Sequence, residues 1–237
     1  MTKNAPQSSI RQGNHDTETG VLLTKPRSYR TFKALFLLGR GRRLNAALVA
    51  LSGAATDHSV ADIGCGPGDL ARALAVRVGP GGRVVGVDPA AEMIDYASAH
   101  SRATTNCRFE LGSAQTLTLP DASFDVVTST FAMHHIPEQH RRAAIAQMFR
   151  ILRPGGTLLL ADTHPTGPVL SAVVRIMARF AARRTHDAGP GHHADPVVAV
   201  DIRRYRDLLT DVGFGEVAFH TVEPATGVLL ATKEIRR

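Results

Sequence analysis

The sequence predicts a domain of the α/β class, built around a mostly parallel β-sheet. From residue 60 onwards, short apolar runs typical of strands alternate with apolar positions at helical spacing, which is the pattern of parallel strands joined by crossover helices. Of the 237 residues, 43% are hydrophobic, and no low-complexity tract interrupts them. The chain can therefore bury the core of one domain with additions.

Seven short apolar runs are predicted as strands. In order they are Val60–Ile63, Val84–Val87, the weaker Arg108–Leu111, Phe124–Thr128, Thr157–Ala161, Glu216–Val222 and Gly227–Lys233. The first five alternate with helices and are therefore expected to be parallel. The last two are joined by a connection too short for a crossover, so these two are expected to run antiparallel.

Apolar side chains at helical spacing predict three helices between these strands. They lie around residues 70–74, 93–97 and 145–152. A further helix is expected around Asp201–Val212, where Gly213 provides the end signal.

Two parts of the chain lie outside this alternation. Residues 1–26 are polar and without periodicity, so we expect a mobile arm, with the domain spanning 27–237. Helices over 30–56 and an insertion at 163–196 are expected to form a lid. The insertion carries an apolar stripe, Leu170–Ala181, with arginines beside it, which predicts an amphipathic helix for core packing or for lining an acceptor pocket.

Charge and composition exclude several classes of function. Residues 1–56 hold nine Lys and Arg against two Asp and Glu, which accounts for the whole net charge of +7, so nucleic-acid binding is not expected of the domain. No apolar stretch approaches the roughly 18 residues of a membrane span, and we expect no stable membrane insertion. Two cysteines without metal-ligand spacing indicate a reducing cytoplasm and no metal site.

A glycine-rich loop follows the first strand, with Gly64, Gly66 and Gly68 leading into a helix. Glycines there let the backbone turn sharply and let a nucleotide-like ligand lie against bare amides. The last glycine of the dinucleotide pattern G-x-G-x-x-G is replaced by Asp69, and Asp62 adds a carboxylate ahead of the loop. Two carboxylates disfavour a phosphate and favour S-adenosylmethionine, which carries an ammonium and a sulfonium and no phosphate.

The second predicted strand ends at Asp88, twenty residues after Gly68. A carboxylate at this position can accept hydrogen bonds from the ribose hydroxyls of a nucleoside. The alternative is a helix N-cap ahead of Pro89, and both roles stay open.

With these features the sequence resembles the class I S-adenosylmethionine-dependent methyltransferases, in the small-molecule branch that includes the ubiquinone/menaquinone C-methyltransferases. The resemblance covers residues 57–163 in five ordered blocks. They are Asp62–Gly68, Val87–Pro89 with Met93, Gly112–Pro120, Ser123–Val127 and Leu152–Gly156. The resemblance implies a Rossmann-like, seven-stranded, mostly parallel sheet with an antiparallel last strand, and S-adenosylmethionine as cofactor.

Carried over position by position, the resemblance implies which residues contact the cofactor. Gly64 and Gly66 would approach the methionine moiety, Asp88 would hold the ribose, and Pro89, Met93, Ser113 and the backbone of Ala114 would lie near the adenine. Asp62, Cys65 and Thr130 complete the predicted cofactor set. Ser113 departs from the family, which usually has Asp there. A neutral acceptor is weaker than a charged one by about 1 kcal/mol, so cofactor affinity is expected to be modest.

The fourth strand leads into Ser129–Ile136, where acceptor contacts lie in this fold. The segment lacks the Asn/Asp-Pro-Pro-aromatic motif of nucleic-acid amino-methyltransferases, so a small organic acceptor is favoured. His134 and His135 are adjacent, and on an extended segment they point to opposite sides. One of them is the candidate general base, since imidazole titrates near neutrality; the alternative is a histidine packed in a turn.

The predicted function is methyl transfer from S-adenosylmethionine to a small, apolar or aromatic acceptor. Oxygen is the first choice of acceptor atom, with carbon and nitrogen open. One alternative is a cofactor-binding protein without turnover, indicated by Ser113 and by the lack of a clear catalytic group. A second alternative is a nicotinamide-dependent oxidoreductase, disfavoured by Asp62 and Asp69. The sequence leaves the acceptor, the pathway and the formation of a homodimer open.

Overall fold

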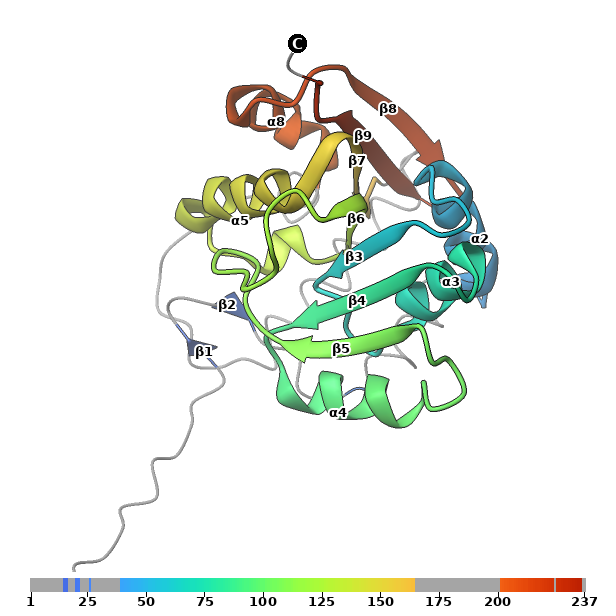
Figure 1. The fold of residues 1–237 in the computed structure, drawn as a ribbon. Coiled ribbons are helices and arrows are strands. Elements are labelled where there is room, and N and C mark those ends of the chain that lie inside the picture. The colour runs from blue at the N-terminus through green and yellow to red at the C-terminus, as the bar shows by residue number, and fades with distance from the viewer. Residues whose placement is uncertain are drawn as a thin grey trace, which may run out of the picture.

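Seven strands form one sheet in the order β5-β4-β3-β6-β7-β9-β8 (Figure 1). The computed structural model describes residues 39–164, 201–223 and 225–235, together with 15–16, 20–21 and 26. The strands are β3 Ser59–Ile63, β4 Arg83–Asp88, β5 Cys107–Leu111, β6 Phe124–Thr130, β7 Leu152–Thr163, β8 Val217–Val222 and β9 Thr226–Thr232. All pairs from β5 to β7 are parallel, and β9 is antiparallel to both β7 and β8. The predicted fold class, including the antiparallel last strand, is confirmed.

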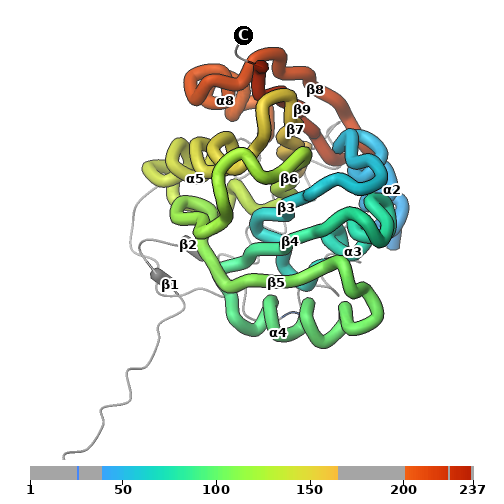
Figure 2. The backbone as a smooth tube through the Cα atoms, in the orientation of Figure 1, coloured from blue at the N-terminus to red at the C-terminus, as the bar shows by residue number. Residues whose placement is uncertain are grey.

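Different helices cover the two faces of the sheet (Figure 2). On one face, α2 (Gly41–Leu51) and α3 (Asp69–Val78) bury residues such as Leu48 and Leu74 against the valines of β3, β4 and β6. On the other, α5 (Glu138–Ile151), the 3₁₀ helix η2 (Ile202–Tyr205) and α8 (Arg206–Val212) bury their apolar side chains against β6, β7 and β9. The helix α4 (Ala91–Ala99) packs along β4 and β5. The strand β3 is buried along its whole length, and its carboxyl end leads into the glycine loop.

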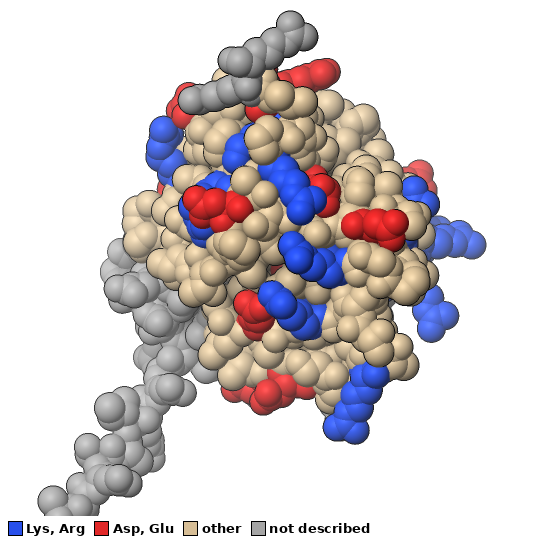
Figure 3. Space-filling view, viewed as in Figure 1, with Lys and Arg blue, Asp and Glu red and all other residues tan. Residues whose placement is uncertain are grey.

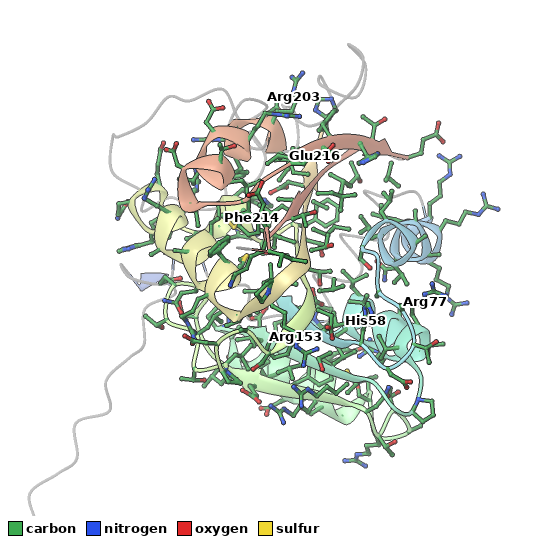
Figure 4. All side chains as sticks on the ribbon, turned by 45° about the horizontal axis from the view of Figure 1, so that its top comes forward. His58, Arg77, Arg153, Arg203, Phe214 and Glu216 are labelled. Atoms are coloured by element: carbon green, nitrogen blue, oxygen red, sulfur yellow. The ribbon has the colours of Figure 1, made fainter. Side chains whose placement is uncertain are left out.

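Packing between α5 and α8 includes an aromatic pair. Phe214, labelled in Figure 4, follows α8 and meets Phe149 of α5 edge-on, with 4.9 Å between the ring centroids. Edge-to-face pairs at this spacing add about 0.5–1.5 kcal/mol beyond the burial of their area. The contact helps hold the last helix on the face of the sheet that also carries η2.

An ionic cluster joins three strands at the amino end of the parallel sheet, opposite the glycine loop. Asp125 of β6 accepts a hydrogen bond from the backbone N–H of Ser59 at 2.8 Å and from Arg153 of β7 at 2.5 Å. Partial burial raises the pKa of Asp125, but the Ser59 N–H and the Arg153 guanidinium outweigh the effect of burial, and the net pKa lies below the ordinary value.

In Figure 3 basic and acidic side chains are mixed over the face shown, so the charges on this face form no area of a single sign.

Several element boundaries differ from the sequence prediction, most of them by one or two residues at a strand end. The helix expected over 145–152 ends at Ile151, and Leu152 begins β7, because Pro154 disfavours helical backbone just before it and Leu152 pairs with Phe124. The helix expected over Asp201–Val212 is divided into η2 and α8. Thr163, the expected first residue of the insertion, is the last residue of β7.

Several predictions fall outside the described residues. The stripe Leu170–Ala181 and the rest of the expected insertion over residues 165–196 belong to this group, as do residues 30–38 of the expected N-terminal lid helices. Within the expected arm, 1–26, the structure describes β1 (His15–Asp16) and β2 (Gly20–Val21), which pair antiparallel.

Candidate active site

The loop between β3 and α3 requires glycine. Gly64, Gly66 and Gly68 have positive φ angles of 74°, 51° and 77°, which residues with a Cβ rarely adopt. A Cβ at Gly64 would overlap the Cβ of Ala132, which follows β6. The loop backbone therefore lies directly against the chain that leaves the neighbouring strand.

Asp88, the last residue of β4, is joined to this loop. Its Oδ2 accepts a hydrogen bond from the N–H of Gly66 at 2.8 Å, and its Oδ1 accepts one from the N–H of Ala90 at 3.0 Å. Burial raises the pKa of Asp88 above the ordinary value, although the two N–H donors act in the opposite direction. The carboxylate thus braces both the loop and the start of α4. Of these two contacts, the sequence indicated only the second, as a helix cap.

The charge balance at the loop differs from the sequence prediction. Asp62 is buried in β3 and accepts a hydrogen bond from the hydroxyl of Thr128 at 2.7 Å. Asp69, however, pairs with Arg72 one turn later in α3, at 2.5 Å. Arg72 also donates to the carbonyl of Pro67 at 3.0 Å. The guanidinium of Arg72 therefore offsets the repulsion of phosphate that was expected from Asp69. This pair could have been predicted, because residues three apart on a helix are neighbours.

The two cysteines are thiols rather than thiolates. Burial raises the pKa of the Cys65 thiol well above its ordinary value, and the carboxylates of Asp62 and Asp88 raise it further. Burial raises the pKa of Cys107 to about 11. Because the thiolate is the nucleophilic form, neither side chain is suited to attack a substrate carbon.

The other predicted cofactor residues lie at the carboxyl ends of adjacent strands or in the segments that follow these ends. Pro89 follows β4, Met93 is buried in α4, and Ser113 and Ala114 follow β5; Thr130 is the last residue of β6. The N–H of Gly112 donates to the carbonyl of Asp88 at 3.1 Å, which holds the end of β5 beside the end of β4. The fold thus brings the predicted set to one edge of the sheet, around β5, β4, β3 and β6.

The two candidate bases lie in a 3₁₀ turn, η1 (Met133–His135), and differ in their partners. His134 places its Nδ1 2.8 Å from Oδ2 and 3.0 Å from Oδ1 of Asp162, at the end of β7. Asp162 is fully buried, whereas His134 keeps 24% of its side chain exposed. His134 therefore combines solvent access with a fixed carboxylate partner, as a general base requires.

His135 lies in a different environment. Its ring centroid is 4.0 Å from that of His134. Burial, and then the neighbouring His134, lowers the pKa of His135 to about 3. His135 therefore stays neutral around neutral pH, and its role as a titrating base is disfavoured relative to that of His134.

The lowered pKa of His135 predicts an acid-sensitive fold. Unfolded histidine has a pKa of about 6.5, so between about pH 6.5 and 3 the unfolded chain binds one more proton at this position, and stability falls as the pH falls. We expect His135→Gln to reduce the loss of unfolding free energy between pH 7 and pH 5 by on the order of 1–2 kcal/mol. Urea denaturation at the two pH values measures the difference; equal losses in both proteins would contradict it.

Sequence analysis did not assign Asp162 to the site. The available signal was a lone acidic residue after the apolar run Leu158–Ala161, at the carboxyl end of a buried strand. On β7 it shares the sheet face of Leu158 and Leu160, because side chains alternate along a strand. Its pairing with a histidine 28 residues earlier is visible only in the folded chain.

The matched family model is described as a methyltransferase domain and spans residues 60–156. The ubiquinone/menaquinone biosynthesis C-methyltransferase UbiE of Ectopseudomonas mendocina is 31% identical over 198 residues, covering 77% of this chain and 74% of that protein. The chain belongs to the class I S-adenosylmethionine-dependent methyltransferase family.

A further relative and a solved structure show how much of the chain is similar to known proteins. The chain is 37% identical over 127 residues to the uncharacterized methyltransferase YcgJ of Bacillus subtilis, covering 52% of the chain and 48% of YcgJ. It spans about half the length of YcgJ and of two other curated relatives that it matches. The crystal structure of a SAM dependent methyltransferase from Aquifex aeolicus has a TM-score of 0.66 at 19% identity, covering 88% of this chain and 98% of that one, which shows the same fold.

Among the described residues there is neither a membrane-spanning helix nor a cluster of metal ligands. In residues 39–164, 201–223 and 225–235, no helix has both the length and the apolar character needed to cross a bilayer. Across the same ranges, no three His, Cys, Asp or Glu side chains are grouped so that they could hold a metal ion.

Ser113 stands where the sequence resemblance leads us to expect Asp, and Ser113→Asp tests whether this position faces the cofactor. We expect the substitution to preserve or tighten S-adenosylmethionine binding, by up to about fivefold, because a charged acceptor gains about 1 kcal/mol over a neutral one. Calorimetry measures the change. Ser123→Asp, just ahead of β6 at the opposite end of the sheet, adds the same charge and should leave the affinity unchanged. A tenfold weakening in Ser113→Asp alone would show that position 113 does not face the adenine.

Proposed function

We propose that this chain binds S-adenosylmethionine at the carboxyl ends of β3 and β4 and transfers the methyl group to a small, apolar or aromatic acceptor, with oxygen as the acceptor atom. The observation that carries the proposal is the contact between the glycine loop and the segment of the candidate base. Gly64 lies against Ala132, and Ala132 accepts a hydrogen bond from the backbone N–H of His135 at 3.0 Å. The glycine loop and His134 are therefore neighbours.

The groups at the loop suit this cofactor. Each oxygen of a carboxylate can accept more than one hydrogen bond, so Asp88 can serve ribose hydroxyls while it braces Gly66 and Ala90. Asp62 adds a buried carboxylate behind the loop, and the charge of Asp69 is balanced by Arg72. The balance stays negative, which favours a cationic ligand over the pyrophosphate of a dinucleotide.

When bound, S-adenosylmethionine supplies an electrophilic methyl group. The residues of this chain bind the cofactor, orient the acceptor and hold a proton. Asp62, Gly64, Cys65, Gly66 and Asp88, with Pro89, Met93, Ser113, Ala114 and Thr130, form the proposed cofactor set. His134 takes the proton that the acceptor loses. Positioning dominates the remaining barrier, because in-line displacement requires the reacting atoms to lie about 3–3.5 Å apart.

The choice of acceptor is supported by two facts. A relative at 31% identity is named as a C-methyltransferase of ubiquinone/menaquinone biosynthesis, which supports a small acceptor and keeps carbon as the second choice of atom. A histidine with a carboxylate partner supports oxygen, because a hydroxyl is a weak nucleophile until a base removes its proton.

Calorimetry with S-adenosylmethionine, S-adenosylhomocysteine and NAD tests the cofactor. The first two should bind and NAD should not. Incubation with methyl-labelled S-adenosylmethionine and a panel of small phenols, enols and amines then tests transfer. NAD binding without S-adenosylmethionine binding would support the oxidoreductase alternative. Cofactor binding without labelled product from any acceptor would favour a binding protein without turnover.

A further inference from the structure

The side chain of Asp162 is held in one orientation. Its Oδ1 accepts a hydrogen bond from the backbone N–H of Thr163 at 2.8 Å, and both oxygens lie within 3.0 Å of Nδ1 of His134. Asp162 lies on β7, which pairs with β6 on one side and β9 on the other, so its backbone cannot move independently of the sheet. The carboxylate is fully buried.

This arrangement determines the tautomer of His134. A carboxylate only accepts hydrogen bonds, so the Nδ1 of a neutral imidazole beside it must carry the hydrogen. The lone pair of the ring then lies on Nε2. A buried carboxylate also stabilises the imidazolium that forms when Nε2 takes up a proton.

The other ionisable groups around His134 and Asp162 do not take the place of Asp162 as the partner of Nδ1 of His134. His135 on η1 stays neutral because burial lowers its pKa to about 3. Tyr205 on η2 is buried and close enough to Asp162 for the carboxylate to contribute to raising its pKa, after burial itself. Arg141 and Glu138 on α5 and Arg204 on η2 also act on Tyr205. The Nε of Arg141 donates to the carbonyl of Ile136 at 2.9 Å, and Arg204 pairs with Glu138 at 3.3 Å.

We infer that Asp162 is a positioning residue that holds His134 with hydrogen on Nδ1, so that Nε2 accepts the proton of an acceptor that carries a phenolic or enolic hydroxyl. The inference rests on the proposed function and adds to it the residue that selects His134 over His135. It also narrows the acceptor class. Simple amines shed their proton to water after methylation, whereas a hydroxyl needs a base during the transfer.

The proposed step balances. The acceptor oxygen forms a bond to the methyl carbon as the bond from that carbon to sulfur breaks, and the electron pair of the broken bond stays on sulfur. The hydroxyl proton passes to Nε2 of His134. The products are the methyl ether, neutral S-adenosylhomocysteine and the imidazolium of His134 paired with Asp162. The imidazolium then returns its proton to water.

Nitrogen NMR of protein labelled with ¹⁵N-histidine tests the tautomer without any acceptor. We expect the His134 ring to carry its hydrogen on Nδ1 in the wild type and to shift towards hydrogen on Nε2 in Asp162→Asn. His134→Gln assigns the signals. Asp201→Asn is the matched control, because Asp201 also neighbours a histidine, His164, at 3.7 Å on the same side of the sheet. An unchanged His134 tautomer in a folded Asp162→Asn protein would overturn the inference.

Kinetics with an acceptor found by the labelling screen give the second test. Asp162→Asn should lower turnover about 10- to 10²-fold and change S-adenosylmethionine affinity less than threefold, since Asp162 acts through His134. The double variant with His134→Gln should then be no slower than His134→Gln alone. Additive losses would assign Asp162 a separate role and overturn the inference.

If Asp162→Asn fails to fold, the tautomer of His134 in the wild type provides the test. Hydrogen on Nε2 of His134 in the wild type would then overturn the inference. Absent cofactor binding or transfer in the wild type would instead reject the proposed function and leave the tautomer result standing.

Discussion

Replacing His134 by alanine is expected to lower turnover about 10²–10⁴-fold, the range typical for loss of a general base, while S-adenosylmethionine binding changes less than threefold. The two effects separate because the base acts on the acceptor, whereas the cofactor set lies on the glycine loop and the strand ends beside it. A general base acts only in its deprotonated form, so a base at the acceptor gives the pH–rate profile of the wild type an acid limb.

The matched variant for this experiment is His135→Ala in the neighbouring position of the same 3₁₀ turn. Its turnover should fall less than about tenfold, and its pH–rate profile should keep the acid limb of the wild type. His134→Ala should lose that limb, and added imidazole should restore part of the rate. If both variants retained the wild-type profile, neither histidine would be the base, and positioning alone would account for the transfer.

Asp88→Ala is expected to weaken S-adenosylmethionine binding by about 1.5–3 kcal/mol, or roughly 10- to 150-fold, the scale of hydrogen bonds to a charged group. The loss has two sources. The substitution removes the proposed acceptor of the ribose hydroxyls, and it also removes the brace between β4, Gly66 and Ala90. Asp88→Asn keeps one acceptor oxygen and should lose less.

A ligand lacking the ribose 2′-hydroxyl separates the two sources. If Asp88 contacts the ribose, 2′-deoxy-S-adenosylhomocysteine should bind the wild type more weakly than the parent compound but bind Asp88→Ala equally well, because the contact is already lost. If Asp88 only braces the loop, the deoxy ligand should show the same deficit against both proteins. A total loss under threefold would reduce Asp88 to a helix cap.

Local patterns predicted much of this molecule. Strands such as β3 and β4 are buried on both faces and appear in the sequence as short, mostly apolar runs, so their positions were predicted closely. The glycine loop was predictable because positive φ at Gly64, Gly66 and Gly68 leaves a direct trace in residue type. Leu152 shows the limit: it continues a helical stripe in sequence, but pairing with Phe124 places it in β7.

The sequence by itself determined the fold class, the loop for a nucleoside-like ligand and the strand-end position of Asp88, because each depends on residues close together in the chain. Only the tertiary structure decided which histidine has a partner. Asp162 meets His134 because β6 and β7 are neighbours in register, with Thr130 opposite Ala161. Contacts between separate elements depend on strand order, register and side-chain direction, and the linear pattern of apolar and polar residues does not encode these.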